Sequence, residues 1–121
     1  GYHELEEEQV ESAKMYIDAG GDAVVGHHAH VLQGIEFYKN KPIIYNLGDF
    51  IFNANTEETA MFQIKINVDG DMEYYILPAL QKDCFTDFLN GTEKQKLINK
   101  IISWSINANI DEFGKITEKI A

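Results

Sequence analysis

Apolar positions change their spacing along the chain, and each spacing predicts a different kind of element. From Leu5 to Ala19 they recur at helical intervals and Gly20 and Gly21 follow, which predicts an amphipathic helix that ends at glycine. Residues 22–26 form a short, almost wholly apolar run, which is typical of a strand covered on both faces in an α/β sheet. A helix, a glycine turn and a buried strand together predict half of a βαβ unit.

The middle of the chain alternates between apolar and polar residues, as antiparallel strands do. Two hairpins are predicted, with strands at 34–38 and 42–47 and at 59–68 and 72–77. Asp69-Gly70 is a strong turn signal between the second pair, and 49–52 is expected to continue or re-enter a sheet. One face of the third strand would carry Phe62, Ile64, Ile66 and Val68.

The spacing becomes helical again after Asn90-Gly91. An apolar stripe predicts a helix from about Thr92, and it consists of Leu97, Ile98, Ile101, Ile102 and Ile106. A third, shorter helix is expected over 111–120, weakened by Gly114. We therefore expect one domain over 1–121 of the α/β (α+β) class, with a helix at 5–19, mainly sheet at 22–78 and a helical tail at 92–120.

Composition narrows the classes of partner. The chain has 121 residues, 45% of them hydrophobic, which predicts one soluble globular unit. Ten basic residues, all lysine, stand against twenty acidic ones, and the net charge of -10 argues against nucleic acid or an anionic membrane surface as a partner. Cys84 is the only cysteine, so an intramolecular disulfide is excluded. No apolar run approaches the length of a membrane span, so the chain is expected to be soluble as given.

Three of the four histidines lie within four positions, directly after the first predicted strand. Ligands in α/β folds bind at such strand ends. His28 and His30 are two residues apart, so in an extended segment both rings project to one side, whereas His27 points the other way. Imidazole suits zinc, manganese or iron, so a metal site is one interpretation. The other is that the rings are structural and bond to backbone and aromatic neighbours.

Two acidic residues bear on the same region. Asp49 follows Gly48 after a predicted strand, and it could ligate a metal, act as a general base or orient a histidine. Gly48-Asp49 could equally be only a turn. Glu36, inside the first predicted hairpin, is expected to be an exposed strand residue.

Two stretches of the chain resemble the CapA family of bacterial capsule and poly-γ-glutamate synthesis proteins. The resemblance covers roughly residues 9–52 and is carried by the motifs GHHAHVLQ at 26–33 and KPIIYNLGDFIF at 41–52. Two positions depart from the family pattern, since Ala29 stands where the family usually has proline and Asp49 where it usually has asparagine.

This resemblance implies a calcineurin-like metallophosphatase fold, which is a two-sheet sandwich flanked by helices with a two-metal centre at the strand ends. The family's closing motif is histidine, any residue, histidine. It makes His28 and His30 candidate ligands of a divalent metal such as Mn, Zn or Fe, with His27 adjacent. Asp49, selected from its position after Gly48, is the candidate catalytic residue and adds a charge near the proposed site. The chain would then be the C-terminal half of the domain and hold only part of the ligand set.

The resemblance also implies a role in capsule or poly-γ-glutamate biosynthesis. The longer protein would be a metal-dependent hydrolase, or alternatively a non-catalytic assembly or export component. A third reading is an α+β interaction domain with structural histidines. This part alone is expected to be inactive and to pair with the missing N-terminal half or with a second copy, which would cover an exposed sheet edge. The parent would be cell-envelope associated, through a segment not present here, with a membrane-bound poly-γ-glutamate synthetase complex as its partner.

Overall fold

The structure is a computed structural model and describes residues 2–119. Two helices and eight strands lie within this range, in the order α1 (Glu7–Asp18), β1 (Val24–Val25), β2 (Ile35–Tyr38), β3 (Lys41–Ile44), β4 (Glu57–Ile66), β5 (Met72–Lys82), β6 (Phe85–Phe88), α2 (Gly91–Trp104), β7 (Ala108–Ile110) and β8 (Lys115–Glu118). Neither helix of this range is long and apolar enough to cross a membrane.

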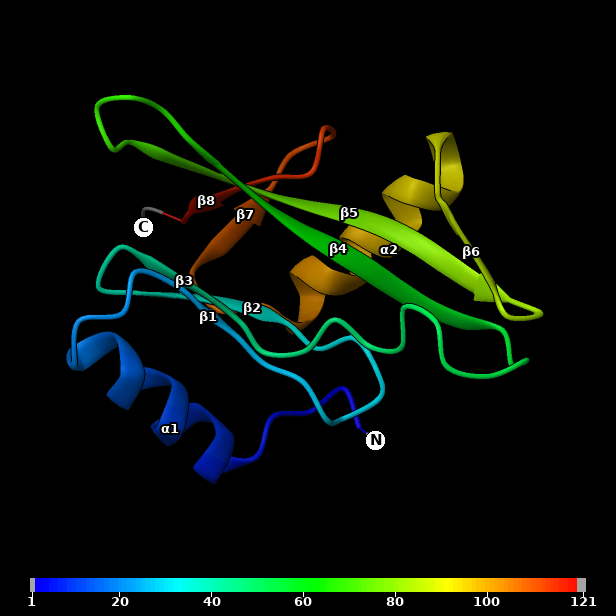
Figure 1. The fold of residues 1–121 in the computed structure, drawn as a ribbon, viewed down its shortest axis with the longest axis horizontal. Helices are drawn as coiled ribbons and strands as arrows, with labels where there is room; N and C mark the ends of the chain where they lie inside the picture. Colours follow the sequence, from blue (N-terminus) through cyan, green and yellow to red (C-terminus); the bar gives the residue numbers. More distant parts are fainter. Residues whose placement is uncertain (1, 120–121) are drawn as a thin grey trace.

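The strands form two sheets that pack as a sandwich (Figure 1). The smaller sheet has the order β1-β3-β2, in which β1 runs parallel to β3 and β2 runs antiparallel to it. The larger sheet has the order β4-β5-β8-β7, and β6 also pairs with β5. This arrangement confirms the expected α+β class with flanking helices.

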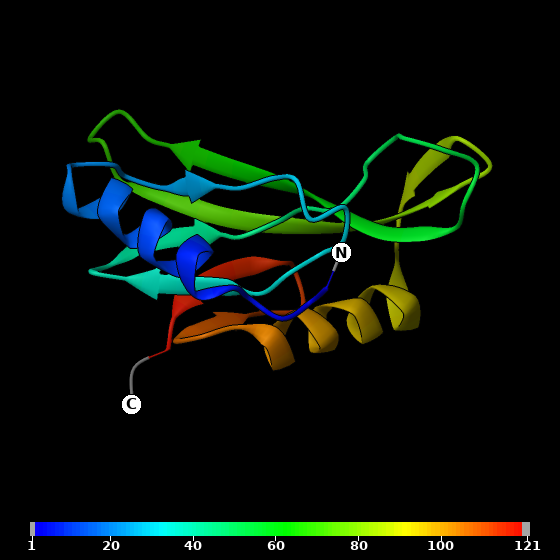
Figure 2. The same ribbon diagram turned by 90° about the horizontal axis from the view of Figure 1, so that it is seen from below.

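The smaller sheet is covered on its two faces by different parts of the chain. Ile43 and Tyr45 are buried with Ala13 and Ile17 of α1. Ile44, one position away, belongs instead to the main core with β4, β5, β7, β8 and α2. Alternate side chains of a strand point to opposite faces, which explains why neighbouring residues join different clusters. Figure 2 shows α2 along the side of the molecule opposite β4.

Most of the predicted elements are confirmed. The helix over 5–19, the two hairpins and the helix from Thr92 correspond to α1, β2 with β3, β4 with β5, and α2. The backbone N–H of Glu6 donates to Gln9 Oε1 at 3.3 Å, which satisfies one of the free donors at the start of α1. Ala13 and Ile17 form the buried face of that helix.

Two predictions on either side of the first hairpin are wrong. The strand expected at 22–26 is only Val24–Val25 and is not covered on both faces, since Val25 is 40% exposed. The segment 49–52 does not enter a sheet, because its backbone is held by side chains: Gln81 Oε1 accepts from the Phe52 N–H, and the Thr86 hydroxyl donates to the Phe50 carbonyl.

The predicted third helix is also wrong. Residues 108–118 form a hairpin, β7 with β8, rather than a helical tail. The alternation places Ile110 and Ile116 in the main core, and these two residues are opposite each other across the hairpin. Gly114 has a φ of +85°, and a side chain there would strike the Ile76 carbonyl of β5.

Ile106, which the apolar stripe placed in the second helix, lies after the end of α2 and bridges to Glu36. Residue 120 lies outside the described residues.

The expectation for Glu36 is corrected as well. It is only 4% exposed, because the free side of β2, an edge strand of the smaller sheet, is covered at Glu36 by the bridge to Ile106, and residues 35–37 are all buried. Its carboxylate accepts a hydrogen bond from the Tyr45 hydroxyl at 2.7 Å and lies 3.5 Å from Lys14 Nζ. A buried carboxylate therefore links α1 to the smaller sheet.

Candidate functional site

The loop that carries the three histidines connects β1 to β2 and is fixed at both ends. The N–H of Gly26 donates to the Ile44 carbonyl at 2.8 Å, and the N–H of Gln33 donates to the Asn46 carbonyl at 3.1 Å. Leu32 also bridges to Leu47. The chain before and after the histidines is thus held against β3 and the segment that follows β3.

Between these anchors the backbone takes up an uncommon conformation. His28 has a φ of 97° and His30 a φ of 63°, in the region that side-chain-bearing residues seldom occupy. Such strain persists only where surrounding contacts hold it, and it is often found at binding and catalytic sites. The loop is therefore not the extended segment that the spacing suggested, although the two rings still lie near each other, with centroids 6.3 Å apart.

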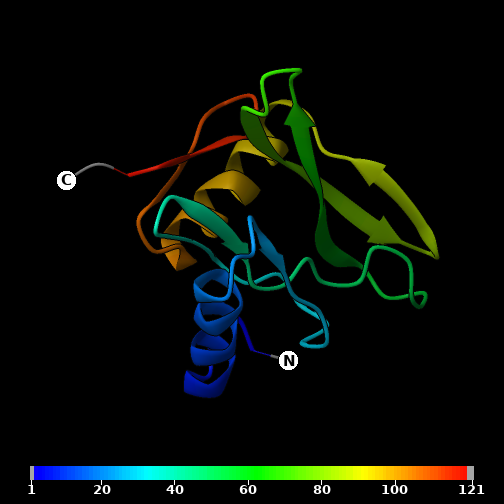
Figure 3. The same cartoon turned by 60° about the vertical axis from the view of Figure 1, so that its left-hand side comes forward.

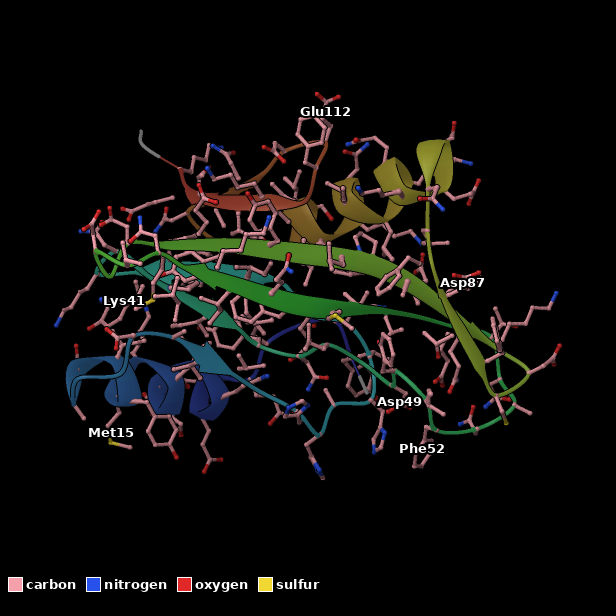
Figure 4. The ribbon with its side chains drawn as sticks, turned by 45° about the horizontal axis from the view of Figure 1, so that its top comes forward. Met15, Lys41, Asp49, Phe52, Asp87 and Glu112 are labelled. Atoms are coloured by element: carbon pink, nitrogen blue, oxygen red, sulfur yellow. The ribbon has the colours of Figure 1, made fainter. Side chains whose placement is uncertain are left out.

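Asp49 is the second predicted site residue that the structure brings to this loop. Its Oδ1 lies 2.8 Å from Nδ1 of His30, at hydrogen-bonding distance. The Asp49 side chain is 11% exposed and that of His30 is 54% exposed, so the pair has an inner carboxylate and an outer ring. Phe52 flanks the same ring at a centroid distance of 5.1 Å. In Figure 4, Asp49 and Phe52 lie close together on the side of the molecule below β4.

Glu57, which sequence reasoning did not select, is adjacent to this pair. Its pKa is raised above the ordinary value, first by burial and then by the charge and hydrogen bonding of Asp49, while His30 acts in the opposite direction. Its Oε2 accepts from Gln81 Nε2 at 3.3 Å. Glu57 begins β4 and looks in the sequence like any acidic strand residue, so no local signal marked it.

Gln81 was also missed, and it holds the loop that carries Asp49. Its side chain is fully buried in β5. Its Oε1 accepts from the Phe52 N–H at 2.5 Å, and its Nε2 donates to the Asn55 carbonyl at 3.2 Å. With the bond to Glu57, every contact of this amide goes to residues 52–57. A buried amide fully used in this way fixes the loop relative to the sheet.

Replacing Asp49 by asparagine is expected to move the pKa of Glu57 down towards its ordinary value. The substitution removes the neighbouring negative charge and leaves the burial in place, so the shift should shrink without vanishing. A raised carboxyl pKa contributes stability at low pH that is lost as pH rises through the folded-state pKa, so this dependence should also weaken. Carboxyl ¹³C chemical shifts measured against pH would follow both effects.

Glu73 provides the control for that titration. A hydrogen bond from Lys115 lowers its pKa, and it belongs to the distal part of β5. Its titration should be the same in the native chain and in Asp49→Asn. A Glu57 pKa that does not change in the variant would contradict the assigned coupling between the two carboxyls.

A pocket of about 670 Å³ opens beside the histidine loop. The described residues that line it are Tyr2, Glu4, Glu6, Glu8, Gln9, Ser12, His27, His28, Ala29, His30 and Gln33. Glu4, Glu6 and Glu8 form an acidic wall of this pocket. Gln33, which is 4% exposed, holds the chain at the start of this wall, because its Nε2 donates to the carbonyls of Tyr2 at 2.9 Å and Glu4 at 3.3 Å. This wall of carboxylates and imidazoles suits a cation better than an anion.

The predicted ligands agree with a metal site in one respect and fall short of one in another. Asp49 occupies Nδ1 of His30 and leaves Nε2 for a ligand, which is how carboxylates commonly orient metal-binding histidines. Within residues 2–119, however, no three His, Cys, Asp or Glu side chains converge closely enough to hold an ion. The described residues thus place a carboxylate on Nδ1 of His30 and leave Nε2 open, without a third such side chain close by.

Comparisons with known proteins relate the first half of the chain to capsule synthesis proteins. The family model described as bacterial capsule synthesis protein PGA_cap matches residues 2–54. The chain is 39% identical over 69 residues to the capsule biosynthesis protein CapA of Bacillus anthracis, covering 54% of this chain and 17% of that protein. It is 37% identical over 73 residues to the PGA biosynthesis protein CapA of Bacillus subtilis, covering 58% and 19%.

A shorter match points in the same direction. A probable polyglutamine synthesis accessory protein of Mycobacterium tuberculosis is 49% identical over 39 residues, which is 32% of this chain and 10% of that protein. The chain spans less than a fifth of the length of these curated relatives.

Proposed function

Since the chain is CapA-like over its first half, we propose that it is part of a capsule or poly-γ-glutamate biosynthesis protein and carries the histidine side of a metal-dependent hydrolase centre. The observation that carries this proposal is the hydrogen bond between His30 and Asp49 at the strained histidine loop. Both residues and His28 lie inside the matched segment 2–54.

Each residue has a distinct part in this proposal. His28 and His30 would hold the divalent ion, Mn, Zn or Fe, with His27 beside them, and the ion would supply Lewis-acid chemistry for phosphoester or related hydrolysis. Asp49 orients His30 through Nδ1, and Glu57, whose pKa is raised by burial and by Asp49, lies beside this pair. Gln81 keeps the loop that presents Asp49 in place.

The charge of the molecule limits what can bind here. With a net charge of -10 and an acidic wall at Glu4, Glu6 and Glu8, the chain repels a polyanion such as poly-γ-glutamate. A cation held between the wall and the histidines would offset that repulsion. The proposed metal therefore serves anion binding as well as chemistry.

The second candidate function is a non-catalytic assembly or export component of a membrane-bound poly-γ-glutamate synthetase complex. The incomplete ligand set within residues 2–119 and the accessory role in the name of the mycobacterial relative both favour it. Cell-envelope association of the whole protein belongs to the same proposal. The third candidate, an interaction domain with structural histidines, would need neither metal nor synthetase.

Calorimetric titration of Mn²⁺ and Zn²⁺ separates these candidates. We expect the chain to bind one of these ions, and a His28→Ala, His30→Ala double variant to lose at least about 10-fold in affinity, the lower end of what changes around metal ligands typically cost. His27→Ala is the matched control and should lose less, because it keeps both rings of the motif.

The outcome directs the next experiment. Loss of binding in the double variant justifies phosphoesterase assays on the longer protein with and without metal. Binding that is unaffected by the double substitution would contradict the ligand assignment. A longer protein that lacks metal-dependent hydrolysis but co-purifies with the synthetase would favour the assembly role, and one that does neither would favour the interaction domain.

A further inference from the structure

The outer edge of β4 is the longest unpaired strand edge among the described residues. β4 extends over ten residues and pairs with β5 on one side only. Its first residues are partly covered, since the Thr59 hydroxyl donates to the Leu47 carbonyl at 2.7 Å and Gly48 lies against the Glu58 carbonyl. From Ala60 onward, no other described strand pairs with this edge, and Figure 3 shows the hairpin tip extending beyond the rest of the molecule.

The turn of the hairpin determines which backbone groups point outward. Asn67 N–H donates to the Asp71 carbonyl at 3.0 Å, so these two residues stand at a hydrogen-bonded position of the ladder. Hydrogen-bonded pairs alternate along an antiparallel ladder, so residues 61, 63 and 65 bond to β5 and residues 60, 62, 64 and 66 direct their N–H and C=O outward. Ala60 faces Pro78, which has no N–H to donate, in agreement with this assignment.

This edge lacks the features that usually keep strands from associating. The register with β5 is unbroken, so there is no bulge, and residues 57–66 contain no proline. Lys65 is the only charged residue between 59 and 66, and its ammonium lies over the Tyr75 ring, 4.5 Å from the centroid. Ile64 and Ile66, predicted for one apolar face, are 39% and 64% exposed.

We infer that this edge pairs with the same edge of a second copy of the chain, antiparallel about a two-fold axis at Gln63. Centred there, Ala60 faces Ile66 of the other copy and Phe62 faces Ile64, so all four outward-pointing residues of each strand are paired. Apolar side chains then lie opposite one another across the join, and each partly exposed isoleucine gains a hydrophobic neighbour.

Other two-fold registers are less favourable. A centre at Lys65 would place two ammonium groups opposite each other, and a centre at Ile64 would bring them into diagonal contact. A centre at Met61 or Phe62 would need Glu58, where the loop around Gly48 already lies. With the centre at Gln63, each Lys65 faces Met61 of the other copy and the two lysines are well separated.

Charge favours this edge over other surfaces for self-association. Two chains of net charge -10 repel each other overall. The acidic residues of α1 lie beyond the smaller sheet from β4, and residues 59–66 carry a single positive charge, while the repulsion that remains in this register is between Asp69 of one copy and Glu57 of the other (Figure 1). Association should therefore strengthen as salt screens the remaining repulsion.

Disulfide trapping tests this register directly. Cys84 is exposed, so the experiment uses a Cys84→Ser background. Gln63→Cys should form a covalent dimer under mild oxidation, because opposite residues in a non-hydrogen-bonded pair have Cα atoms about 4.5 Å apart, within disulfide reach. Lys65→Cys is the matched control on the same exposed face. It should not form a covalent dimer, since the two copies of that residue are about 13 Å apart along the strands.

Sedimentation of the unmodified chain supplies the second measurement. We expect a concentration-dependent dimer that Ile64→Lys abolishes and that Met15→Lys, an equally apolar-to-charged change on the exposed face of α1, leaves intact. Circular dichroism of each variant establishes that it is folded. A chain that stays monomeric at every concentration, or equal trapping at 63 and 65, would overturn the inference.

Discussion

Replacing Gly34 by alanine is expected to destabilise the fold by about 3 kcal/mol, the upper part of the range for inserting a methyl group into a filled core. A Cβ at this position would overlap the carbonyl group of Trp104 and lie 2.9 Å from the Ser105 nitrogen. Gly34 precedes β2 at the point where α2 ends, so the substitution would push these two elements apart.

Neither the start of β2 nor the end of α2 can easily move away from this contact. The N–H of Ile35 donates to the Ser105 hydroxyl oxygen at 2.9 Å, and that hydroxyl donates to the Ile101 carbonyl at 2.6 Å. The N–H of Ile106 donates to the Ile35 carbonyl at 2.8 Å. Moving the backbone by the distance that a methyl group needs would therefore break several buried hydrogen bonds.

Urea denaturation of Gly34→Ala beside Gly70→Ala measures this effect. Gly70 has a φ of +87°, and a Cβ added there would meet nothing within 4 Å, so its substitution reports backbone strain alone and should cost about 1 kcal/mol. Equal losses of unfolding free energy in the two variants would contradict the tight packing of Gly34 against Trp104.

Replacing Lys14 by methionine is expected to cost about 2 kcal/mol. Glu36 would keep the hydrogen bond from Tyr45 but lose its only cation within 4.0 Å among the described residues. Breaking a fully buried pair costs about 3 to 5 kcal/mol, and the value here is smaller because the Lys14 side chain is 37% exposed. Burial, followed by the nearby carboxylate, raises the pKa of Tyr45, so its hydroxyl remains a donor at neutral pH.

A double-mutant cycle assigns this loss to the buried charge. Glu36→Gln in the Lys14→Met background removes the unpaired charge and should recover most of the stability. Lys39→Met is the control, because its partner Asp18 is exposed and surface pairs contribute little. If urea denaturation shows equal losses for Lys14→Met and Lys39→Met, Glu36 does not depend on Lys14 for compensation.

The elements that could be predicted from the sequence are those whose signal is local. Three such signals are the apolar stripe of α1, that of α2 and the Asp69-Gly70 turn. Each involves residues that are close together in the sequence, and the structure confirms all three. The tail differs from its prediction because Ile110 and Ile116 fit a weak helical pattern, while their contacts with the main core and the close approach of Gly114 to β5 favour a hairpin.

Residue type and spacing selected His28, His30 and Asp49, the family resemblance also pointed to the two histidines, and the role of these residues in metal binding stays a prediction. That Asp49 reaches His30, and that Glu57 and Gln81 surround the pair, follows from the way β4 and β5 bring together residues far apart in the sequence. Local periodicity determined α1, α2 and the first two hairpins because backbone hydrogen bonding in helices and hairpins is short-range. The tertiary structure alone decided the burial of Glu36 and the membership of the site, because burial and charge pairing depend on side chains from distant strands.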